Sequence, residues 1–224
     1  MQHDFYEQQD CLDSMVDQIA AVLINAIERT GRAGLAVSGG RSPVHLFQRL
    51  SLEDLPWENV YVTLVDERFV APDHPDSNEL LVRTHLLKNR ARRAQFTGLV
   101  SHPDDLALSV QEANHQSHKI DLALLGMGED GHTASLFPDA PELAQALDTR
   151  ASHRYIHVSP PLAAQQRISM TLAALLATGH LLLAISGPRK RRVLEQAALQ
   201  PTPRLPVSYI LSQTGVPLDV YWHP

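Results

Sequence analysis

The apolar positions of this chain fall into two patterns, one with helical spacing and one of short, nearly continuous runs. Residues 12–29 carry apolar side chains three and four positions apart, which predicts an amphipathic helix that ends at Gly31. Six later runs are almost wholly apolar, which is typical of strands buried on both faces of a parallel sheet. These runs are 35–37, 60–65, 120–125, 155–158, 180–186 and 207–211.

Segments with helical spacing separate most of these runs. Residues 44–50 and 78–87 are two of them, and the polar stretch 89–119 is interpreted as a surface connection around one more helix. This alternation predicts a three-layer α/β/α fold with a mainly parallel sheet. No repeat or linker interrupts it, so we expect residues 1–224 to form a single domain. Ligands of such sheets bind at the carboxyl ends of the strands, and we look for the chemistry there.

Composition excludes several classes of protein. The chain has 224 residues and a net charge of −6, which argues against a broad nucleic-acid surface. It has no secretory signal and no apolar stretch of the roughly 20 residues that a membrane helix needs, so we expect a cytoplasmic protein. Cys11, the single cysteine, is expected to be a bystander. The pairs His115 with His118 and His153 with His157 lack convincing ligand spacing, so we predict no metal.

The segment SGGRSP, residues 38–43, directly follows the first run. Ser42 is a good N-cap, and Pro43 suits the first position of the next helix. Gly39 and Gly40 let the backbone approach a ligand closely, and free N–H groups at the start of a helix bind anions. The alternative is a tight turn between a strand and a helix, without a ligand.

The second run is followed without a spacer by three charged residues, Asp66, Glu67 and Arg68. Charges at the end of a buried strand bind sugar hydroxyls or a developing charge, or they form a local ion-pair cluster. The residues alone leave both interpretations open. The loop 71–78 is a candidate for closing over the site, and either Asp76 or Ser77 would cap the helix after it.

The third run is followed by a G-x-G-x-x-G pattern, made by Gly126, Gly128 and Gly131. A dinucleotide-binding loop of this pattern continues into a long helix, but here Pro138 soon follows the third glycine. Asp130 would also repel a pyrophosphate, and no acidic residue ends the next run. We therefore reject a dinucleotide site. The loop instead places His132 beside Asp130, and because histidine exchanges protons near neutrality we predict an acid–base site.

The fourth candidate is ISGPRKRRVLEQA, residues 185–197. Pro188 suits the first helical position, so the four cations 189–192 crowd the N-terminus of the helix. Positive charge is unfavourable at that end because of the helix dipole, but a bound anion would reverse this effect. A cationic helix start of this kind suggests phosphate, and the alternative is a solvated basic face.

Five segments together resemble the glucosamine-6-phosphate isomerase/6-phosphogluconolactonase family, in the family's order along nearly the whole chain. They are SGGRSP, VDERFVAPDHPDSN, GMGEDGHTASLFP, RISMTLAAL and SGPRKRRVL. The resemblance implies a Rossmann-like fold with no metal, nucleotide or other cofactor. The match is to the lactonase branch, which implies hydrolysis of 6-phospho-D-glucono-1,5-lactone to 6-phospho-D-gluconate in the oxidative branch of the pentose phosphate pathway.

The resemblance also implies roles for individual residues. His132 is the expected acid–base with Asp130 beside it, and Arg68 is expected to contact the substrate or its phosphate. The expected phosphate-binding residues are Gly39, Gly40, Ser42, Arg167 and Lys190, and Asp66, Glu67 and Gly128 are expected to contribute to substrate binding. Two points stay open: whether Arg189 or Lys190 reaches the ligand, and which carboxylate orients His132.

For a lactone substrate, we expect His132 to take a proton from the water that attacks the carbonyl carbon. N–H groups of the loop 126–131, with Arg68, are expected to stabilise the oxyanion. Ser38 and Ser135 lie outside a G-x-S-x-G motif, so neither is expected to be a nucleophile.

Two other functions are considered. The sister branch of the family isomerises or deaminates amino-sugar phosphates with a glutamate at the place where this chain has Phe137, which disfavours that activity. Sugar-phosphate sensors carry an added helix-turn-helix, for which this sequence has no spare segment. We therefore expect a sugar-phosphate lactone as the small-molecule partner, no nucleic acid or membrane, and a monomer or weak homodimer.

Overall fold

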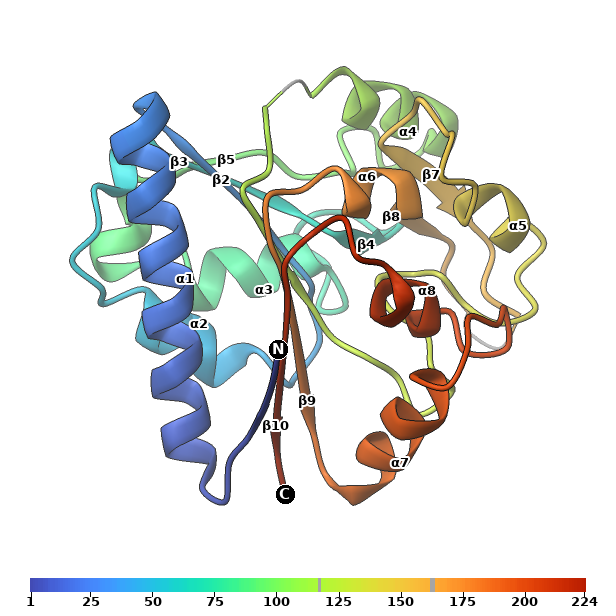
Figure 1. Ribbon diagram of the computed structural model, residues 1–224. Coiled ribbons are helices and arrows are strands. Elements are labelled where there is room, and N and C mark those ends of the chain that lie inside the picture. The colour runs from blue at the N-terminus through green and yellow to red at the C-terminus, as the bar shows by residue number, and fades with distance from the viewer. Residues whose placement is uncertain (117, 162–163) are drawn as a thin grey trace.

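The main element of the fold is a seven-stranded sheet in which all neighbouring strands are parallel. A computed structural model describes residues 1–116, 118–161 and 164–224 (Figure 1). The strand order is β1-β10-β9-β6-β2-β3-β5. The strands are β1 (Gln2–Asp4), β2 (Ala33–Val37), β3 (Val60–Leu64), β5 (Gln95–Phe96), β6 (Leu122–Leu125), β9 (Leu181–Ser186) and β10 (Leu218–His223). The predicted α/β fold with a mainly parallel sheet is confirmed.

A second, antiparallel sheet of three strands lies beside the main one, in the order β4-β8-β7. Its strands are β4 (Asp66–Arg68), β7 (Tyr155–Val158) and β8 (Arg167–Met170). Arg68 and Arg167 are directly opposite partners in the β4–β8 ladder. The run 155–158 is therefore a strand, as predicted, but it belongs to this small sheet and not to the parallel one.

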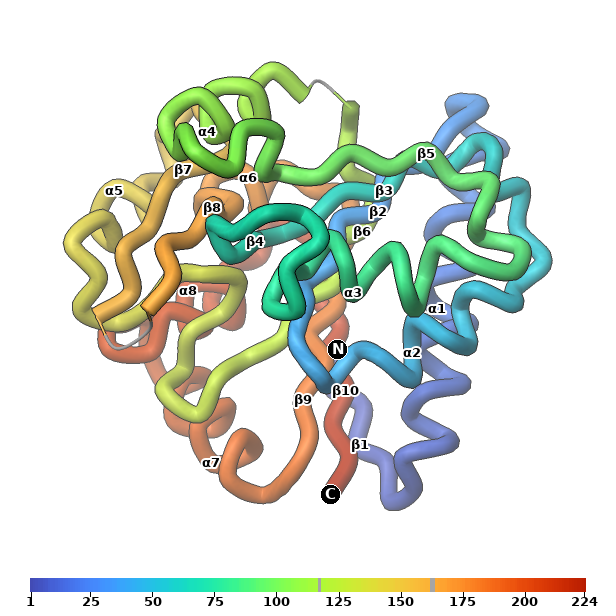
Figure 2. The backbone as a smooth tube through the Cα atoms, turned by 180° about the vertical axis from the view of Figure 1, so that it is seen from behind, coloured from blue at the N-terminus to red at the C-terminus, as the bar shows by residue number. Residues whose placement is uncertain are grey.

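Helices cover the main sheet on both sides. Figure 1 shows α1 and α8 in front of the strands, and Figure 2, seen from behind, has α3 and the small sheet in front. The α-helices are α1 (Gln8–Thr30), α2 (Val44–Leu50), α3 (Asn78–His85), α4 (Leu106–His115), α5 (Leu143–Ala146), α6 (Leu172–Leu176), α7 (Pro188–Ala197) and α8 (Val207–Ser212). Two 3-10 helices, η1 (Trp57–Asn59) and η2 (Asn89–Arg93), complete the set in the described residues.

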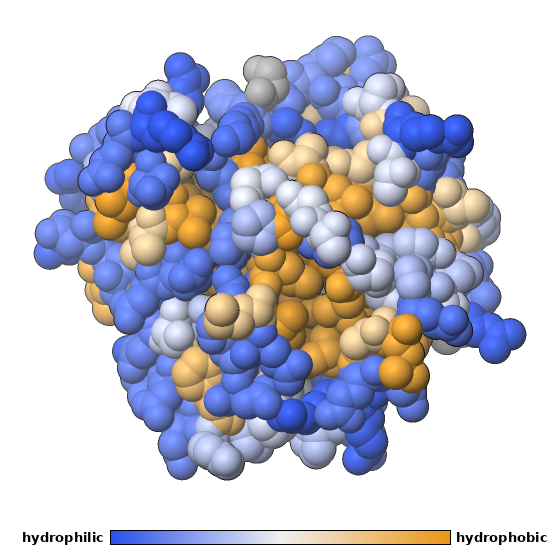
Figure 3. Space-filling view, viewed as in Figure 1, coloured by the Kyte–Doolittle hydropathy of each residue, from blue (hydrophilic) through white to orange (hydrophobic). Residues whose placement is uncertain are grey.

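The apolar runs form the core as their patterns predict. Each residue of β2, β3 and β6 is buried, because helices or the small sheet cover both faces of these central strands. α1 buries one stripe at helical spacing, from Cys11 to Ala26, and ends at Gly31 in the left-handed conformation (φ 80°). Figure 3 shows an apolar tract between α1 and α8, bordered by hydrophilic residues. No helix in the described parts of the chain has the length and apolarity to cross a membrane.

Two predictions about local structure were wrong. The run 207–211 is the helix α8, since Val207 and Ile210 are buried with helical spacing after Pro206; a short apolar run does not distinguish strand from helix. Ser42 caps nothing, because Pro43 occupies the N-cap position of α2 and no side chain bonds to that helix end. The prediction that Asp76 or Ser77 caps α3 is confirmed, because Ser77 accepts the hydrogen bond from the Leu80 N–H.

The stretch 89–119 holds more structure than a surface connection. It contains α4, as predicted, but also η2 and the edge strand β5. Leu99 and Val100 in this stretch are buried. Ser117, which also falls in it, lies outside the described residues. Strands β1, β4, β8 and β10 were not predicted, because charged or aromatic residues interrupt their apolar patterns.

Candidate active site

A cavity of about 680 Å³ lies at the carboxyl ends of the adjacent strands β2, β6 and β9. The segments that follow these three strands line it, and residues of the small sheet and of α1 complete its wall. All of the predicted site residues line this cavity except Asp130 and Glu67. The four candidate segments of the sequence therefore converge at one place, as expected for ligands of open parallel sheets.

The turn after β2, residues 39–42, presents its backbone to the cavity. Within the described residues, the N–H groups of these four positions donate to no protein acceptor. Gly40 has a φ of 90°, a conformation that L side chains rarely adopt. Successive free N–H groups in such a turn form a concave anion site. This open turn, and not a capped helix end, is the part of SGGRSP that can hold a phosphate.

The loop after β6, residues 126–131, holds the imidazole of His132. Nδ1 of His132 lies 2.5 Å from an Oδ1 oxygen of Asp130, so Asp130 is the carboxylate that orients the ring. Burial acts to raise the pKa of Asp130, but the hydrogen bonds and charge of His132 outweigh it and the pKa lies below its usual value. Asp130 is thus ionised near neutrality, which favours a proton on Nδ1 and leaves Nε2 as the base.

Two neighbours fix the position of the His132 ring from its other sides. A Cβ on Gly128 would lie 2.3 Å from the imidazole, so only glycine allows the ring its place. The Phe137 ring packs against His132 with 4.4 Å between the centroids. The Gly128 N–H donates to the His132 carbonyl (2.9 Å), which closes the loop on itself. Of the loop N–H groups expected to stabilise an oxyanion, that of Gly128 is therefore already engaged, and Gly128 supports His132 instead.

Two arginines from the small sheet, Arg68 and Arg167, face the cavity side by side. No carboxylate in the described residues lies within ion-pair distance of either guanidinium. Burial, and then the charge of Arg68, lowers the pKa of Arg167. Like charges on directly opposed residues of an antiparallel pair are destabilising, and an anion bound between them would relieve this.

Asn78 and Asp66 complete the wall around Arg68. The Asn78 Oδ1 accepts from the Arg68 guanidinium at 2.5 Å, and its Nδ2 donates to the Asp66 carbonyl at 2.8 Å. Asn78 also packs so closely on Gly39 that a Cβ there would meet its amide at 1.8 Å. Ser135 donates to the Asp66 carboxylate at 2.6 Å. Sequence reasoning missed Asn78, because nothing in the residues after the cap Ser77 indicates a tertiary contact.

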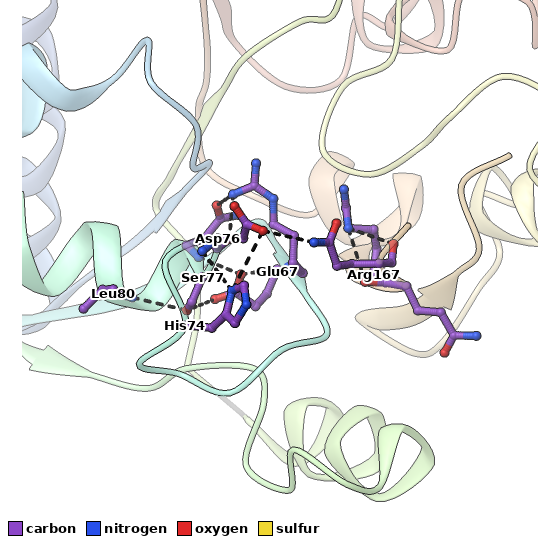
Figure 4. Close-up of polar contacts among 10 residues, drawn as sticks. Glu67, His74, Asp76, Ser77, Leu80 and Arg167 are labelled. Atoms are coloured by element: carbon purple, nitrogen blue, oxygen red, sulfur yellow. Dashed lines mark hydrogen bonds and ion pairs between the residues drawn. The ribbon is translucent and has the colours of Figure 1, made fainter. Parts of the chain in front are cut away.

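Glu67 lies outside the cavity, and its expected contribution to substrate binding is corrected here. Its carboxylate accepts the N–H groups of Arg68, Asn78 and Glu79 and the hydroxyl of Ser77. Figure 4 shows Glu67 beside Ser77, with Arg167 apart on the neighbouring strand. Burial raises the pKa of Glu67 to about 7 although these four hydrogen bonds act in the opposite direction. Glu67 ties the loop after β4 to the start of α3, and none of residues 69–77 lines the cavity.

At the start of α7, Lys190 faces the cavity and Arg189 does not. Lys190 lines it, whereas Arg189 is exposed and lies 3.7 Å from Glu129 on the outside of the neighbouring loop. Pro188 occupies the first turn of α7, as predicted. Arg41, which was not among the predicted site residues, also lines the cavity. Four cations and one carboxylate, Asp66, thus line the cavity of a chain whose net charge is −6.

The remaining candidates from the sequence have other surroundings. The His118 ring packs at a tilt against Tyr61, and His157 lies beside Ser159 and Glu142. No group of three or more metal-ligating side chains occurs among the residues the structure describes.

Cys11 borders the cavity, where burial raises the pKa of its thiol to about 11. Residues 132–137 form turns and no helix, which agrees with the rejection of a dinucleotide loop.

Known proteins resemble this chain along nearly its whole length. The sequence model of the family described as glucosamine-6-phosphate isomerases/6-phosphogluconolactonase matches residues 6–222. A 6-phosphogluconolactonase of Neisseria meningitidis is 41% identical over 228 aligned residues, covering 98% of this chain and 97% of the relative. One from Pseudomonas aeruginosa is 41% identical over 212 residues, covering 92% and 88%.

Solved structures show the same fold. The crystal structure of a 6-phosphogluconolactonase from Shewanella baltica superimposes with a TM-score of 0.93 at 35% identity, covering 100% of this chain and 97% of the other. A monomeric glucosamine-6-phosphate deaminase gives a TM-score of 0.82 at 16% identity, covering 99% and 96%. At that identity the likeness to the deaminase shows the fold alone.

Proposed function

This chain belongs to the glucosamine-6-phosphate isomerase/6-phosphogluconolactonase family, and from that premise we propose that it hydrolyses 6-phospho-D-glucono-1,5-lactone to 6-phospho-D-gluconate. One observation is the main support: His132, which Asp130 orients, lines the same cavity as an open run of N–H groups and a set of cations that have no carboxylate partner in the described residues. The reaction belongs to the oxidative branch of the pentose phosphate pathway. Near 40% identity to lactonases over almost the full length supports it.

The phosphate end of the substrate is assigned to the open turn and its cationic neighbours. The N–H groups of Gly39, Gly40 and Ser42 would bind phosphate oxygens, and Arg167 and Lys190 would balance the charge. Binding the phosphate there sets the distance of the lactone carbonyl from the imidazole. Energy from this remote contact then orients the reacting end of the substrate.

The reaction step is assigned to His132. Nε2 takes a proton from water as the water oxygen attacks the C1 carbonyl, forming a tetrahedral intermediate. The imidazolium then returns a proton to the ring oxygen as the C1–O bond breaks, which opens the lactone to the acid. Asp130 holds Nδ1 throughout and stabilises the positive charge on the ring.

The developing oxyanion is assigned to Arg68. Its guanidinium lines the cavity and is oriented by the Asn78 amide and by the Asp76 carbonyl at 3.0 Å. A preorganised cation in a partly enclosed site stabilises a transition-state charge more than water does. Asp66, held by Ser135, is left to accept hydrogen bonds from sugar hydroxyls.

The test is an assay of lactone hydrolysis by the purified protein at slightly acid pH, where the spontaneous background is low. Glucono-1,5-lactone with and without the 6-phosphate are compared. We expect efficient hydrolysis only of the phosphorylated lactone, because the unphosphorylated one cannot engage the open turn. No acceleration over the background with either compound would refute the proposal.

The alternative is the isomerase or deaminase activity of the sister branch. Phe137 packs on His132 at the place where that branch uses a glutamate, so a carboxylate for ring opening is missing there. Fructose 6-phosphate and ammonia produced from glucosamine 6-phosphate would show that this second activity is the correct one.

The setting of the enzyme is also part of the proposal. We place the enzyme in the cytoplasm as a single domain that needs no cofactor, metal, nucleic acid or membrane, and that is a monomer or weak homodimer. Light scattering across a hundredfold range of protein concentration would test the last point, since a tight dimer would keep its mass throughout.

A further inference from the structure

A second cavity, of about 270 Å³, lies at the opposite end of the sheet from the active site. Lys119 and Ile120, which line it, come just before β6, whereas the active site follows the end of that strand. His153 and Arg154, just before β7, form another part of its wall. The two cavities share no lining residue among those described.

The lining of this second cavity is basic and apolar. Lys119, His153 and Arg154 are its ionisable side chains within the described residues, and no carboxylate lines it. The rest is mainly small or apolar, and the alanines at 173, 174 and 177 on and after α6 leave space beside Met170. The cavity thus offers a positive end together with a surface for carbon atoms.

Two of these basic side chains have buried polar atoms without a protein partner. Nη1 of Arg154 and Nε2 of His153 are shielded from solvent, and neither forms a hydrogen bond within the described parts of the chain. A buried donor left unsatisfied typically costs about 1–3 kcal/mol, and more when it is charged. Buried polar groups in native proteins are otherwise almost always paired, so two unpaired ones in neighbouring residues of the cavity wall are unusual.

The charge around the cavity is only partly balanced. Lys119 pairs with Asp121 at 3.0 Å, but Asp121 also accepts the Gly34 N–H and lies 3.8 Å from Arg29. The pKa of the nearby His118 is lowered by burial and then by the charges of Arg32 and Arg154. Arg154 is therefore a cation that acts on His118 and that forms no ion pair with a carboxylate in the described residues.

We propose that this second cavity is a binding site for a small organic dianion of the phosphomonoester class, separate from the active site. Arg154 would bind its oxygens through its guanidinium, His153 would lie beside them, and Lys119 would supply charge at the mouth. Arginine suits this task because its planar guanidinium matches phosphate geometry. Two cations and an imidazole favour a doubly charged group over a single carboxylate, and the volume limits the ligand to a few carbon atoms.

Thr171 ties the site to the small sheet. Its hydroxyl donates to the His153 carbonyl at 3.1 Å and its N–H donates to the Arg154 carbonyl at 2.9 Å. Thr171 follows Met170, the last residue of β8, and the first residue of β8 is Arg167 in the active site. A ligand on Arg154 would therefore bind at one end of the strand that carries Arg167 at the other.

The test is a titration with inorganic phosphate at constant ionic strength, followed by the imidazole signals of His153 in NMR spectra. A His153→Gln variant assigns the signals. Because phosphate should also enter the active site, the titration is repeated in Lys190→Ala, which weakens that site only. We expect the His153 response to saturate in both proteins, and to be absent when acetate replaces phosphate.

Arg154→Met is the decisive variant, and Arg92→Met, an exposed arginine on η2, is its control. We expect Arg154→Met to lower phosphate affinity at His153 about tenfold to a hundredfold, the usual effect of losing a charge-assisted hydrogen bond. Its unfolding temperature in chloride should equal or exceed that of the wild type, because the variant removes an unsatisfied buried donor. Lys119→Gln, at an exposed side chain, should weaken binding without affecting the fold.

The results of these titrations either support or overturn the proposed phosphate site. Saturation at His153 that is lost in Arg154→Met and Lys119→Gln but kept in Arg92→Met and Lys190→Ala supports the site. No response at His153, an equal response to acetate, or an unchanged response in both variants overturns it. A response lost only in Lys190→Ala would also overturn it, because it would assign all phosphate binding to the active site and leave the proposed lactonase function standing.

Discussion

Two glycine-rich turns follow the neighbouring strands β2 and β6, and they use glycine for opposite purposes. In the turn 39–42, the N–H groups donate to no described protein acceptor and remain open to a ligand. In the loop 126–131, Gly128 and Gly131 donate to the His132 and Gly128 carbonyls, so these N–H groups are used within the loop. The first turn leaves its backbone N–H groups free for a ligand, and the second uses its backbone to position the His132 side chain.

This difference explains why a glycine pattern misleads when it is read alone. The G-x-G-x-x-G pattern lies in the loop where the N–H groups of Gly128 and Gly131 are engaged, while the anion-binding geometry lies in the shorter SGG turn. In the first turn glycine provides a positive φ at Gly40; in the second the missing Cβ of Gly128 leaves room for an imidazole. The two turns differ in whether their backbone N–H groups already have a hydrogen-bond acceptor within the protein.

The largest expected effect comes from removing the side chain that the second loop positions. His132→Ala should lower kcat by about 10²–10⁴-fold, the usual contribution of general acid–base catalysis. The free energy of unfolding should change little, because the ring is partly exposed. Steady-state kinetics and urea unfolding measure the two quantities. His45→Ala, at another histidine that lines the cavity, is the control. Activity retained within a few-fold in His132→Ala would contradict the assignment.

The first turn is held from outside, by Asn78 and through it by Glu67, and a pH titration of stability tests that support. Burial raises the pKa of Glu67 from 4.5 to about 7, so the folded state holds this proton more tightly than the unfolded state does. Below pH 4.5 both states are protonated. As the pH rises from about 4.5 to 7, the folded state loses about 3 kcal/mol of stability from this group.

Urea unfolding of the wild type and Glu67→Gln between pH 4 and 8 isolates this effect. The stability of the wild type relative to Glu67→Gln should fall across that window, because glutamine does not titrate. Glu129→Gln, at an exposed carboxylate on the other loop, is the control. Parallel curves for the wild type and Glu67→Gln would show that Glu67 is not protonated in the folded state.

The second loop has an internal pair of matched positions. Gly128→Ala would place a Cβ 2.3 Å from the His132 ring, whereas a Cβ on Gly126 would meet nothing within 4 Å. Displacing a catalytic group by about 1 Å can cost roughly 10²-fold, so we expect kcat to fall by about that factor in Gly128→Ala. Gly126→Ala should stay near wild type. Equal losses in both variants would mean that the loop needs glycine flexibility and not space for the ring.

Much of this arrangement was predictable, because buried strands and their carboxyl ends leave strong local patterns. The runs at β2, β3, β6 and β9 are continuous and apolar, and the residues after them are charged or glycine-rich, so the position of the cavity followed from the parallel sheet. Ser77 and Pro188 likewise carry their signals in the local sequence.

The rest depended on tertiary contacts that leave no local trace. DER looks like three exposed charges, but in β4 successive side chains alternate in direction, so Glu67 points into the protein while Asp66 and Arg68 line the cavity. Half of the residues of helix α8 favour strands, and its packing against α6 and α7 favours the helix. Asn78 acts on Gly39 only because β4 returns the chain to the first turn.

The smallest expected effect is on KM, and it tests whether Lys190 at the start of α7 binds the substrate phosphate together with the first turn. Lys190→Ala should raise KM about tenfold with little change in kcat, because it removes one charge-assisted contact at the end of the substrate remote from the reaction. Arg189→Ala, one position earlier and paired with Glu129 on the outside, should leave both constants unchanged. KM values for the phosphorylated lactone measure this. If Arg189→Ala raised KM as much as Lys190→Ala, the effect would come from general positive charge at the helix start, and the open turn would not require a specific partner.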